Sequence, residues 1–472
     1  MFSITKPADL LIACQVVKRS SAPEDYDAYL RHAALVHSIK SSETKRACFV
    51  PSSLFDHRLA LYADQNGNMW TFPRLQELQL DLALHEDQIR PILHLINPLL
   101  QSITLTFVGG EDDGADPYAE QGVHQLMSTL RMTSPPLKTF SLKGLHCGPT
   151  WLQSTSTSTS TSTIPNFLYT APLRDLVLFA RHSTLLPLFT LLSKRPEHHL
   201  KLLHLIAAYH DTDPLPACEG PSLLPTLEVL ALETDHTLLC RQLSFGTLPQ
   251  APNLRTLRCL LTDFAEDEID LHMLFVAIAQ YARSDAPILQ EVVVTSQQYE
   301  SAAYLPSPPI LRAATLKPLT VLAHLKRVDI ELEIFCQVTP QLLDSFAHAW
   351  GQHLERLVIT PCPRVPVDAR DILIGLEDVI AFAAHCPHMH TLGILFTENE
   401  GPIYEYFPRS TALRSLTVGS SPIYSVDYCT KVLQKGFPKL RIMQWSDPGM
   451  FASTCDDYDA RWERVEIRLG LC

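Results

Sequence analysis

The chain has 472 residues, of which 46% are hydrophobic and 19% are charged, a composition typical of a globular protein with a large core. Its 51 acidic residues outnumber its 38 basic ones, and the net charge of −13 excludes a general electrostatic attraction for nucleic acid or an anionic membrane. No two of the 12 cysteines have Cys-x-x-Cys spacing, and no apolar run is long enough to cross a membrane. We therefore expect a soluble intracellular protein, cytoplasmic or nuclear, with reduced cysteines.

The N-terminal segment, residues 1–70, has no clear repeat, and we expect it to form a cap or a degenerate first repeat. Within it, Leu35 to Ile39 is a decayed copy of the motif that recurs later in the chain. The segment from Ala8 to Val17 is apolar but interrupted by polar residues, so it makes a poor signal peptide.

From residue 75 onward, one motif, Leu-x-x-Leu-x-Leu, recurs along the whole chain, often one or two residues after a proline. Its copies begin at Leu75, Leu100, Leu137, Leu173, Leu200, Leu227, Leu254, Leu289, Leu325, Leu354, Met389, Leu413 and Leu440. In the copy that begins at Leu254 the third apolar position is displaced by one residue, to Leu260. The starts lie about 30 residues apart on average, in or near the range of leucine-rich repeats.

The motif predicts a short strand with one buried face, because its fourth and sixth positions alternate with polar neighbours. The clearest example is Val328 to Ile334, where four aliphatic residues alternate with three carboxylates. Helices are expected between strands. Thr339 and Pro340 are an N-cap and a first-turn proline that open a helix from Gln341 to Trp350. Apolar residues at helical spacing predict two more, over Asp368–Ala384 and Asp267–Ala282.

These elements predict a single α/β fold, an irregular leucine-rich-repeat solenoid (a horseshoe) with parallel strands on the concave face and helices on the convex face. The array of about 13 units spans residues 71–447 and includes a low-complexity Ser/Thr loop at 154–163. A C-terminal cap follows over 448–472, in which Trp462 and the amphipathic stretch from Arg461 to Leu471 close the last repeat.

The segment Phe382-Ala-Ala-His-Cys-Pro-His-Met-His-Thr-Leu392 and the helix from Leu342 to Trp350 that leads to Leu354 carry a family resemblance. They resemble the divergent, ribonuclease-inhibitor-like repeats of fungal F-box leucine-rich-repeat proteins. The resemblance implies a substrate-receptor arm of a ubiquitin-ligase adaptor. It also implies that a helical F-box before the repeats docks to a Skp-family partner. No Leu-Pro-x-Glu-Leu-Leu opening precedes Leu75, and the segment from Asp9 to Val17 is the tail of such a domain or has no such role. The chain is then either a truncated F-box protein or a relative without that domain.

Other patterns favour simple structural interpretations. The strict Ser-Thr alternation from Ser154 to Thr163 is better explained as a tolerated loop insertion than as a modified switch. The acidic segment from Gly109 to Asp116 lacks the register of a calcium-binding loop. His385, Cys386, His388 and His390 are the densest set of metal-ligand residue types, but they coincide with the end of a helix and the start of a repeat, so we predict no metal site.

We expect no enzyme activity, no catalytic residue and no cofactor. The chain contains no Gly-x-Ser-x-Gly, His-Glu-x-x-His, Gly-x-Gly-x-x-Gly or Walker motif. A hydrolase assembled from scattered residues is the least favoured alternative.

The positions beside the buried leucines should form a binding surface for another protein. Arg258, Arg327 and Arg356 are the first candidates, because arginine is enriched at interface hot spots. If the repeats stack at a similar radius, these arginines share one patch with Asp329 and Glu331. A scaffold protein without any ligase link is the first alternative to the adaptor.

Overall fold

The computed structural model describes the chain in segments, and the elements below lie within them. The described residues are 2–4, 33–40, 72–83, 92–93, 95–108, 117–147, 168, 171–180, 182–195, 199–207, 222–244, 248–262, 268–296, 310–332, 334–359, 373–398, 408–445 and 458–471. The chain divides into two compact units, Met1–Leu227 and Glu228–Cys472. The predicted domain boundaries near residues 70 and 447, the Ser/Thr run and the acidic segment at 109–116 all lie outside the described residues.

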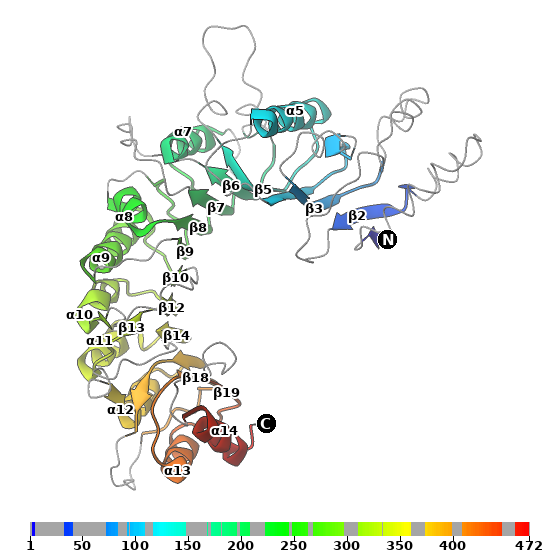
Figure 1. Ribbon diagram of the computed structural model, residues 1–472. Coiled ribbons are helices and arrows are strands. Elements are labelled where there is room, and N and C mark those ends of the chain that lie inside the picture. The colour runs from blue at the N-terminus through cyan, green and yellow to red at the C-terminus, as the bar shows by residue number, and fades with distance from the viewer. Residues whose placement is uncertain are drawn as a thin grey trace. The chain divides into compact units, whose positions relative to one another are not determined.

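The first unit contains a sheet in which each strand pairs in parallel with the next strand of the sequence (Figure 1). Its strands are β1 (Phe2–Ile4), β2 (Val36–Lys40), β3 (Glu77–Ala83), β4 (Ser102–Val108), β5 (Thr139–Cys147), β6 (Asp175–Ala180) and β7 (Leu202–Ala207). Two helices, α5 (Pro117–Thr133) and α7 (His182–Ser193), lie between successive strands in the sequence. This strand–helix–strand alternation is the order that the repeat predicts.

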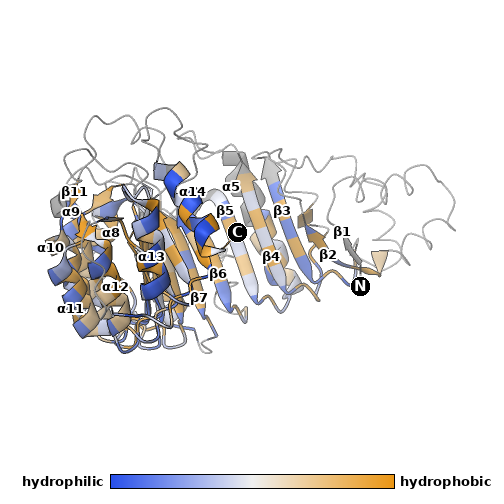
Figure 2. Cartoon of the chain, turned by 90° about the horizontal axis from the view of Figure 1, so that it is seen from below, coloured by the Kyte–Doolittle hydropathy of each residue, from blue (hydrophilic) through white to orange (hydrophobic). Residues whose placement is uncertain are grey.

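The core of the first unit is built from layers of aligned motif residues. The fourth motif position forms one layer across β3 to β7, in which every side chain is fully buried: Leu78, Ile103, Phe140, Leu176 and Leu203. The sixth position forms a second layer beside it, from Leu80 to Leu205. Because side chains alternate along a strand, burying these positions leaves the intervening ones on the other face. Figure 2 shows the resulting hydrophobic and hydrophilic bands on β3, β4 and β5.

The second unit repeats the same plan, and more helices lie within its described residues. The strands of its main sheet are β8 (Val229–Thr234), β9 (Thr256–Leu261), β10 (Glu291–Ser296), β12 (Arg327–Glu331), β14 (Arg356–Ile359), β16 (Thr391–Gly393), β18 (Ser415–Gly419) and β19 (Ile442–Trp445). Two short parallel pairs stand apart from it: β11 (Ile310–Leu311) with β13 (Phe335–Cys336), and β15 (Ile374–Gly375) with β17 (Phe396–Thr397).

The helices of the second unit are α8 (His236–Ser244), α9 (Glu268–Asp285), α10 (Ala313–Leu316), the 3₁₀ helix η4 (Lys317–Val321), α11 (Pro340–Trp350), α12 (Leu376–His385), α13 (Val426–Gly436) and α14 (Tyr458–Leu469). Figure 1 shows α8 to α11 along one side of the strands of this unit. The predicted N-cap at Thr339 is confirmed, because its hydroxyl accepts a hydrogen bond from the backbone N–H of Leu342 at 3.2 Å. The helix predicted over Asp267–Ala282 is also confirmed, as α9.

Two features hold consecutive repeats of the second unit together. A buried layer at the fourth motif position runs from Leu230 on β8 to Met443 on β19, in register across the sheet. A ladder of backbone hydrogen bonds of 2.8–3.0 Å crosses the strand starts, each amide donating to the carbonyl of the preceding repeat. It runs through Glu228, Arg255, Gln290, Lys326, Glu355, His390, Arg414 and Arg441. The motif therefore sets both the core and the strand register.

The helix α14 packs against the end of the second unit through a buried aromatic anchor, Trp462, and an edge-on contact between Tyr458 and Tyr424 at a centroid distance of 6.5 Å. Trp462 is fully buried, its Nε1 donates to the carbonyl of Ser421 at 2.9 Å, and its ring meets Phe396 edge-on at a centroid distance of 5.8 Å. Next to it, the Arg461 guanidinium donates to the carbonyl of Ile423 at 2.7 Å. The rest of the helix is mostly polar (Figure 2).

Three expectations about these elements are wrong in detail. The strand that begins at Val328 ends at Glu331, because Phe335 and Cys336 turn away to pair with β11. The helix predicted from Asp368 begins only at Leu376, since Ile374 and Gly375 form β15. The copy at Leu254 is not displaced: Cys259 takes the buried sixth position, and Leu260 lies on the opposite face.

No helix among the described residues is both long enough and apolar enough to cross a membrane.

Candidate protein-binding surface

The strands of the second unit present a second face, opposite the buried layers, that we call the open face. It consists of the side chains that alternate with the buried motif positions. Strand register places them in rows. One row contains Thr256, Glu291, Arg327, Arg356, Thr391, Ser415 and Ile442; the next contains Arg258, Val293, Asp329, Val358, Gly393, Thr417 and Gln444. Glu331 lies one step further along β12.

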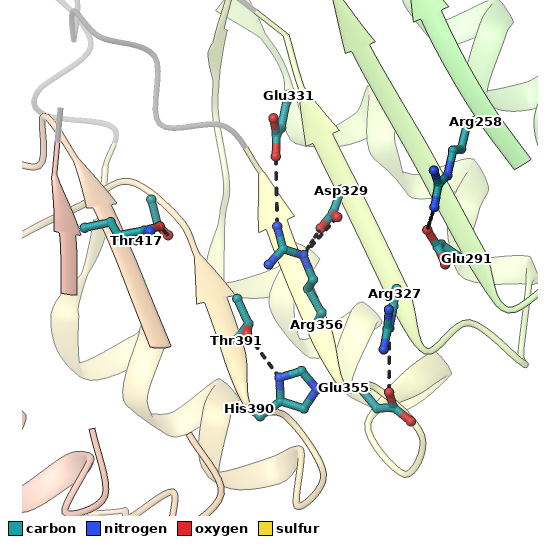
Figure 3. A network of polar contacts seen from close by, with 11 residues as sticks. Arg258, Glu291, Arg327, Asp329, Glu331, Glu355, Arg356, His390, Thr391 and Thr417 are labelled. Atoms are coloured by element: carbon teal, nitrogen blue, oxygen red, sulfur yellow. Dashed lines mark hydrogen bonds and ion pairs between the residues drawn. The ribbon is translucent and has the colours of Figure 1, made fainter. Parts of the chain in front are cut away.

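The five predicted partner-binding residues all lie on this face, on β9, β12 and β14. Arg356 is at the centre of the group (Figure 3). Its Nε lies 2.7 and 2.9 Å from the two carboxylate oxygens of Asp329 on the neighbouring strand. Its Nη2 lies 4.0 Å from Glu331, a contact at the outer limit of an ion pair. The arrangement holds one guanidinium between two carboxylates of β12.

The other two arginines also pair with carboxylates of a neighbouring repeat. Arg258 Nη2 lies 3.2 Å from Glu291 Oε1 on β10, and Arg327 Nε lies 3.7 Å from Glu355 Oε2, just before β14 (Figure 3). Each ion pair therefore bridges two adjacent repeats, as the Arg356–Asp329 pair does. The expected arginine patch is in fact a ladder of ion pairs. We call the seven side chains Arg258, Glu291, Arg327, Asp329, Glu331, Glu355 and Arg356 the ion-pair ladder.

The sequence placed the five residues on one strand face, with Asp329 and Glu331 beside the arginines, but did not identify Glu291 and Glu355 as the partners of Arg258 and Arg327. Glu291 was recognisable as a neighbour by its motif position. Glu355 occupies the second motif position, just outside the strand, and its contact with Arg327 follows only from the register of β12 and β14. The alignment of strand starts across successive repeats is the signal that could have identified it.

Beyond β14 the strands of this sheet carry no charged residue. The open face there consists of hydroxyl, amide and aliphatic groups. The Thr417 hydroxyl donates to Gln444 Oε1 at 3.2 Å, and Ile442 on β19 is half-exposed. Val358 is buried because its side chain covers Gly393, where an added Cβ would lie only 3.0 Å from Val358 Cγ1. The open face thus has a charged part and an adjoining uncharged part.

The first unit also has polar contacts on its equivalent strand face. Lys40 Nζ lies 2.9 Å from Glu77 Oε1, and the Thr139 hydroxyl donates to Asp175 at 3.1 Å. Both contacts again join neighbouring strands.

The histidine- and cysteine-rich segment after α12 has local structural contacts. Cys386 is fully buried, and desolvation raises the pKa of its thiol to about 12, which disfavours the thiolate that zinc requires. His385 Nδ1 hydrogen-bonds the Ala381 carbonyl at 2.7 Å, and His390 Nδ1 lies 3.1 Å from the Thr391 hydroxyl. In the part of the chain that the structure describes, no group of three or more His, Cys, Asp or Glu side chains is arranged to hold a metal ion.

A second cluster combines the residue types of a nucleophilic site. His236 Nε2 on α8 lies 3.3 Å from Asp270 Oδ2 on α9, and Cys240 Sγ lies 3.7 Å from the Asp270 carbonyl oxygen. Burial, followed by the nearby carboxylates of Asp270 and Asp235, raises the pKa of the Cys240 thiol to about 12. A nucleophilic cysteine needs the opposite shift, so this geometry favours a structural role.

Comparison with known proteins yields little. No protein-family model matches the chain, and no curated protein matches it. Among solved structures, the crystal structure of the Rad7 and Elc1 complex in yeast matches at 12% sequence identity with a TM-score of 0.34. That match covers 87% of this chain and 90% of the other. A likeness this weak establishes neither a fold nor a function for the chain.

Proposed function

We propose that this chain is a non-enzymatic recognition protein that binds another protein through the open face. The observation that supports this function is the ion-pair ladder, which fixes charged side chains of successive repeats on one continuous strand face. Repeat arrays characteristically bind partners along such extended faces, on the concave side of the solenoid, with the helices on the convex side.

The specific version that we favour is the substrate-receptor arm of an F-box type ubiquitin-ligase adaptor. It is supported by the resemblance of Phe382–Leu392 and of the Leu342–Trp350 helix to the repeats of that family. On this proposal the open face binds the substrate, and a Skp-family adaptor binds an F-box before the repeats. A scaffold without a ligase link uses the same face and needs no adaptor. A hydrolase is the least favoured alternative.

The binding role is tested by affinity capture with three forms of the full chain from cells that express it. The open-face variant reverses three charges, Arg258→Glu, Arg327→Glu and Arg356→Glu. The control reverses three exposed charges on helices of the same unit, Arg283→Glu, Lys431→Glu and Lys435→Glu, for the same change in net charge. We expect a partner that the control retains and the open-face variant loses. A partner that both variants retain would refute recognition through this face.

Because charge reversal beside carboxylates can unfold the sheet, a second variant leaves every ion pair intact. Ser415→Arg with Gln444→Arg places bulky side chains on the uncharged part of the open face. Circular dichroism melting confirms that each variant is folded before capture. Loss of the same partner in this variant supports the open face independently of the arginines.

The ligase version needs its own measurement. The endogenous protein is purified, its N-terminal peptide is sequenced by mass spectrometry, and its associated proteins are identified. An upstream F-box together with a Skp-family adaptor supports the receptor arm. If the protein starts at Met1 and no such adaptor is associated with it, the result supports the scaffold alternative.

A further inference from the structure

In three pairs of the ion-pair ladder the guanidinium is more exposed than the carboxylate that holds it, and only Glu331, at 50%, is more exposed than the Arg356 side chain beside it. The side chain of Arg258 is 57% exposed against 19% for Glu291, and that of Arg327 is 50% exposed against 35% for Glu355. For Arg356 and Asp329 the values are 33% and 16%. Glu291, Asp329 and Glu355 thus lie closer to the strands than the arginines that they hold. Arg258 and Arg327 are the guanidinium groups that a partner meets first, and Glu331 is exposed beside Arg356.

The ion pairs leave donors on each arginine for a partner. A guanidinium carries five N–H groups. The ion pair with Glu291 engages Nη2 of Arg258, and the pair with Glu355 engages Nε of Arg327. Arg356 donates from Nε to Asp329, and its Nη2 makes only the long contact with Glu331. In the described part of the chain, the other nitrogens of these arginines donate no hydrogen bond to a carboxylate. The planar fork of such a nitrogen pair matches a carboxylate.

The charge of the ladder determines how a partner is selected. Three arginines and four carboxylates sum to −1, and the whole chain carries −13, so no long-range field attracts an acidic protein. Beyond about 8 Å such fields are screened at physiological salt. At contact distance a basic side chain would meet the guanidinium groups of Arg258 and Arg327 before it reached Glu291 and Glu355. Contact therefore favours a carboxylate.

Resting on the proposed binding role of the open face, we propose that the ladder binds a partner segment bearing several Asp or Glu residues. Arg258, Arg327 and Arg356 contact the partner carboxylates. Glu291, Asp329 and Glu355 are positioning residues that hold the arginines extended from the strand face. Arg327 and Arg356 are register neighbours on β12 and β14, about 5 Å apart across the sheet, so they suit two acidic groups close together in the segment.

The experiment selects a phage-displayed library of random dodecamer peptides on the immobilised full chain. Peptides enriched on the wild type are then selected again on the variant Arg258→Gln, Arg327→Gln, Arg356→Gln and on the helix control Arg283→Gln, Lys431→Gln, Lys435→Gln. We expect the enriched peptides to be rich in Asp and Glu, to keep binding the helix control, and to be lost on the open-face variant. By fluorescence polarisation, each single arginine substitution should weaken a selected peptide about tenfold.

The outcomes separate this inference from the function on which it rests. Enriched peptides that depend on the open face but are basic or uncharged overturn the acidic partner and leave protein recognition intact. A selection that yields no peptide dependent on the open face counts against both. Folding of each variant is checked by its melting curve before selection.

The positioning role has a separate readout. Glu291→Gln keeps the size of the side chain and removes its charge, so Arg258 is freed from its fixed position. We expect this substitution to weaken a selected acidic peptide about threefold without a change in melting temperature. In the background of Arg258→Gln, the same substitution should have no further effect, which is the non-additivity expected of a residue that acts through another. If removing Glu291 strengthens binding instead, it repels the partner and does not position the arginine.

Discussion

Replacing Trp462 with alanine should detach the helix α14 from the second unit without unfolding that unit. Trp462 and Val465 are the fully buried side chains of this helix, so most of its docking energy comes from one residue. A buried tryptophan removes about 150–250 Å² from water, which at about 25 cal/mol per Å² stabilises docking by about 4–6 kcal/mol. The hydrogen bond from Nε1 to the Ser421 carbonyl adds about 1 kcal/mol.

After the substitution the fully buried side chain that remains on the described part of this helix is Val465, which contributes about 2 kcal/mol. We therefore expect hydrogen exchange of the amides at Tyr458–Leu469 to accelerate by at least about a thousandfold, since each 1.4 kcal/mol corresponds to a factor of ten. The amides of β8 to β14 should keep their protection.

Two variants make the measurement specific to Trp462. Arg464→Ala changes an exposed residue of the same helix and should leave its exchange rates unchanged. Trp462→Phe keeps an aromatic ring against Phe396 but loses the donor to Ser421, so exchange should rise by only about tenfold. If Trp462→Ala changes the exchange rates of α14 by less than about threefold, other contacts hold the helix and the reasoning is wrong.

Asn97→Ala should lower the free energy of unfolding in urea by about 2–4 kcal/mol, because the Asn97 amide donates to the buried carbonyls of Phe72 at 2.9 Å and Leu75 at 3.0 Å. A loss below about 1 kcal/mol would show that those carbonyls find other partners. Gly144→Ala should lower the same quantity by more than about 2 kcal/mol, since Gly144 has φ +72° and an added Cβ would stand 2.0 Å from the Phe107 carbonyl oxygen. Alanine at the exposed Gly470, which has open space around it, serves as its control. Burial raises the pKa of the Cys259 and Cys386 thiols to about 12, so at pH 8 both should resist alkylation in the native state and react after unfolding in guanidinium. Equal labelling of the native and unfolded chains, measured by mass spectrometry of the peptides, would contradict this.

The parallel-strand array was predictable because its information is local. The motif places leucines at positions whose alternation alone identifies the buried side of a strand, and Leu357 and Leu392 lie where that pattern predicts. Cys259 is the exception, because a search for leucine at the sixth motif position selects Leu260 instead. Cys259 pairs in register with the buried Val294 on β10, so it takes the buried position, where cysteine packs as a small apolar group.

The ion-pair ladder was only half predictable, for a reason that lies in the register. Local alternation places Arg356 and Asp329 on the same face, but their contact is diagonal, between different rows of adjacent strands. Whether the two side chains of a diagonal pair come into contact depends on the alignment of β12 with β14. The sequence does not state this alignment, because the number of residues between successive strands varies from repeat to repeat. No local pattern contains that alignment.

What sets the alignment is the buried layer beneath the charges. Val328 pairs in register with Leu357, both fully buried, and a slip of one residue would turn Arg356 into the core and Leu357 onto the open face. The cost of burying a guanidinium far exceeds the worth of any exposed ion pair. The apolar layer thus fixes the positions at which Arg356 and Asp329 meet, and the ion pair follows from the core. It also follows that removing the charges should change what the open face binds while leaving the strands where they are, which is why the neutral Arg→Gln substitutions can test recognition separately from folding.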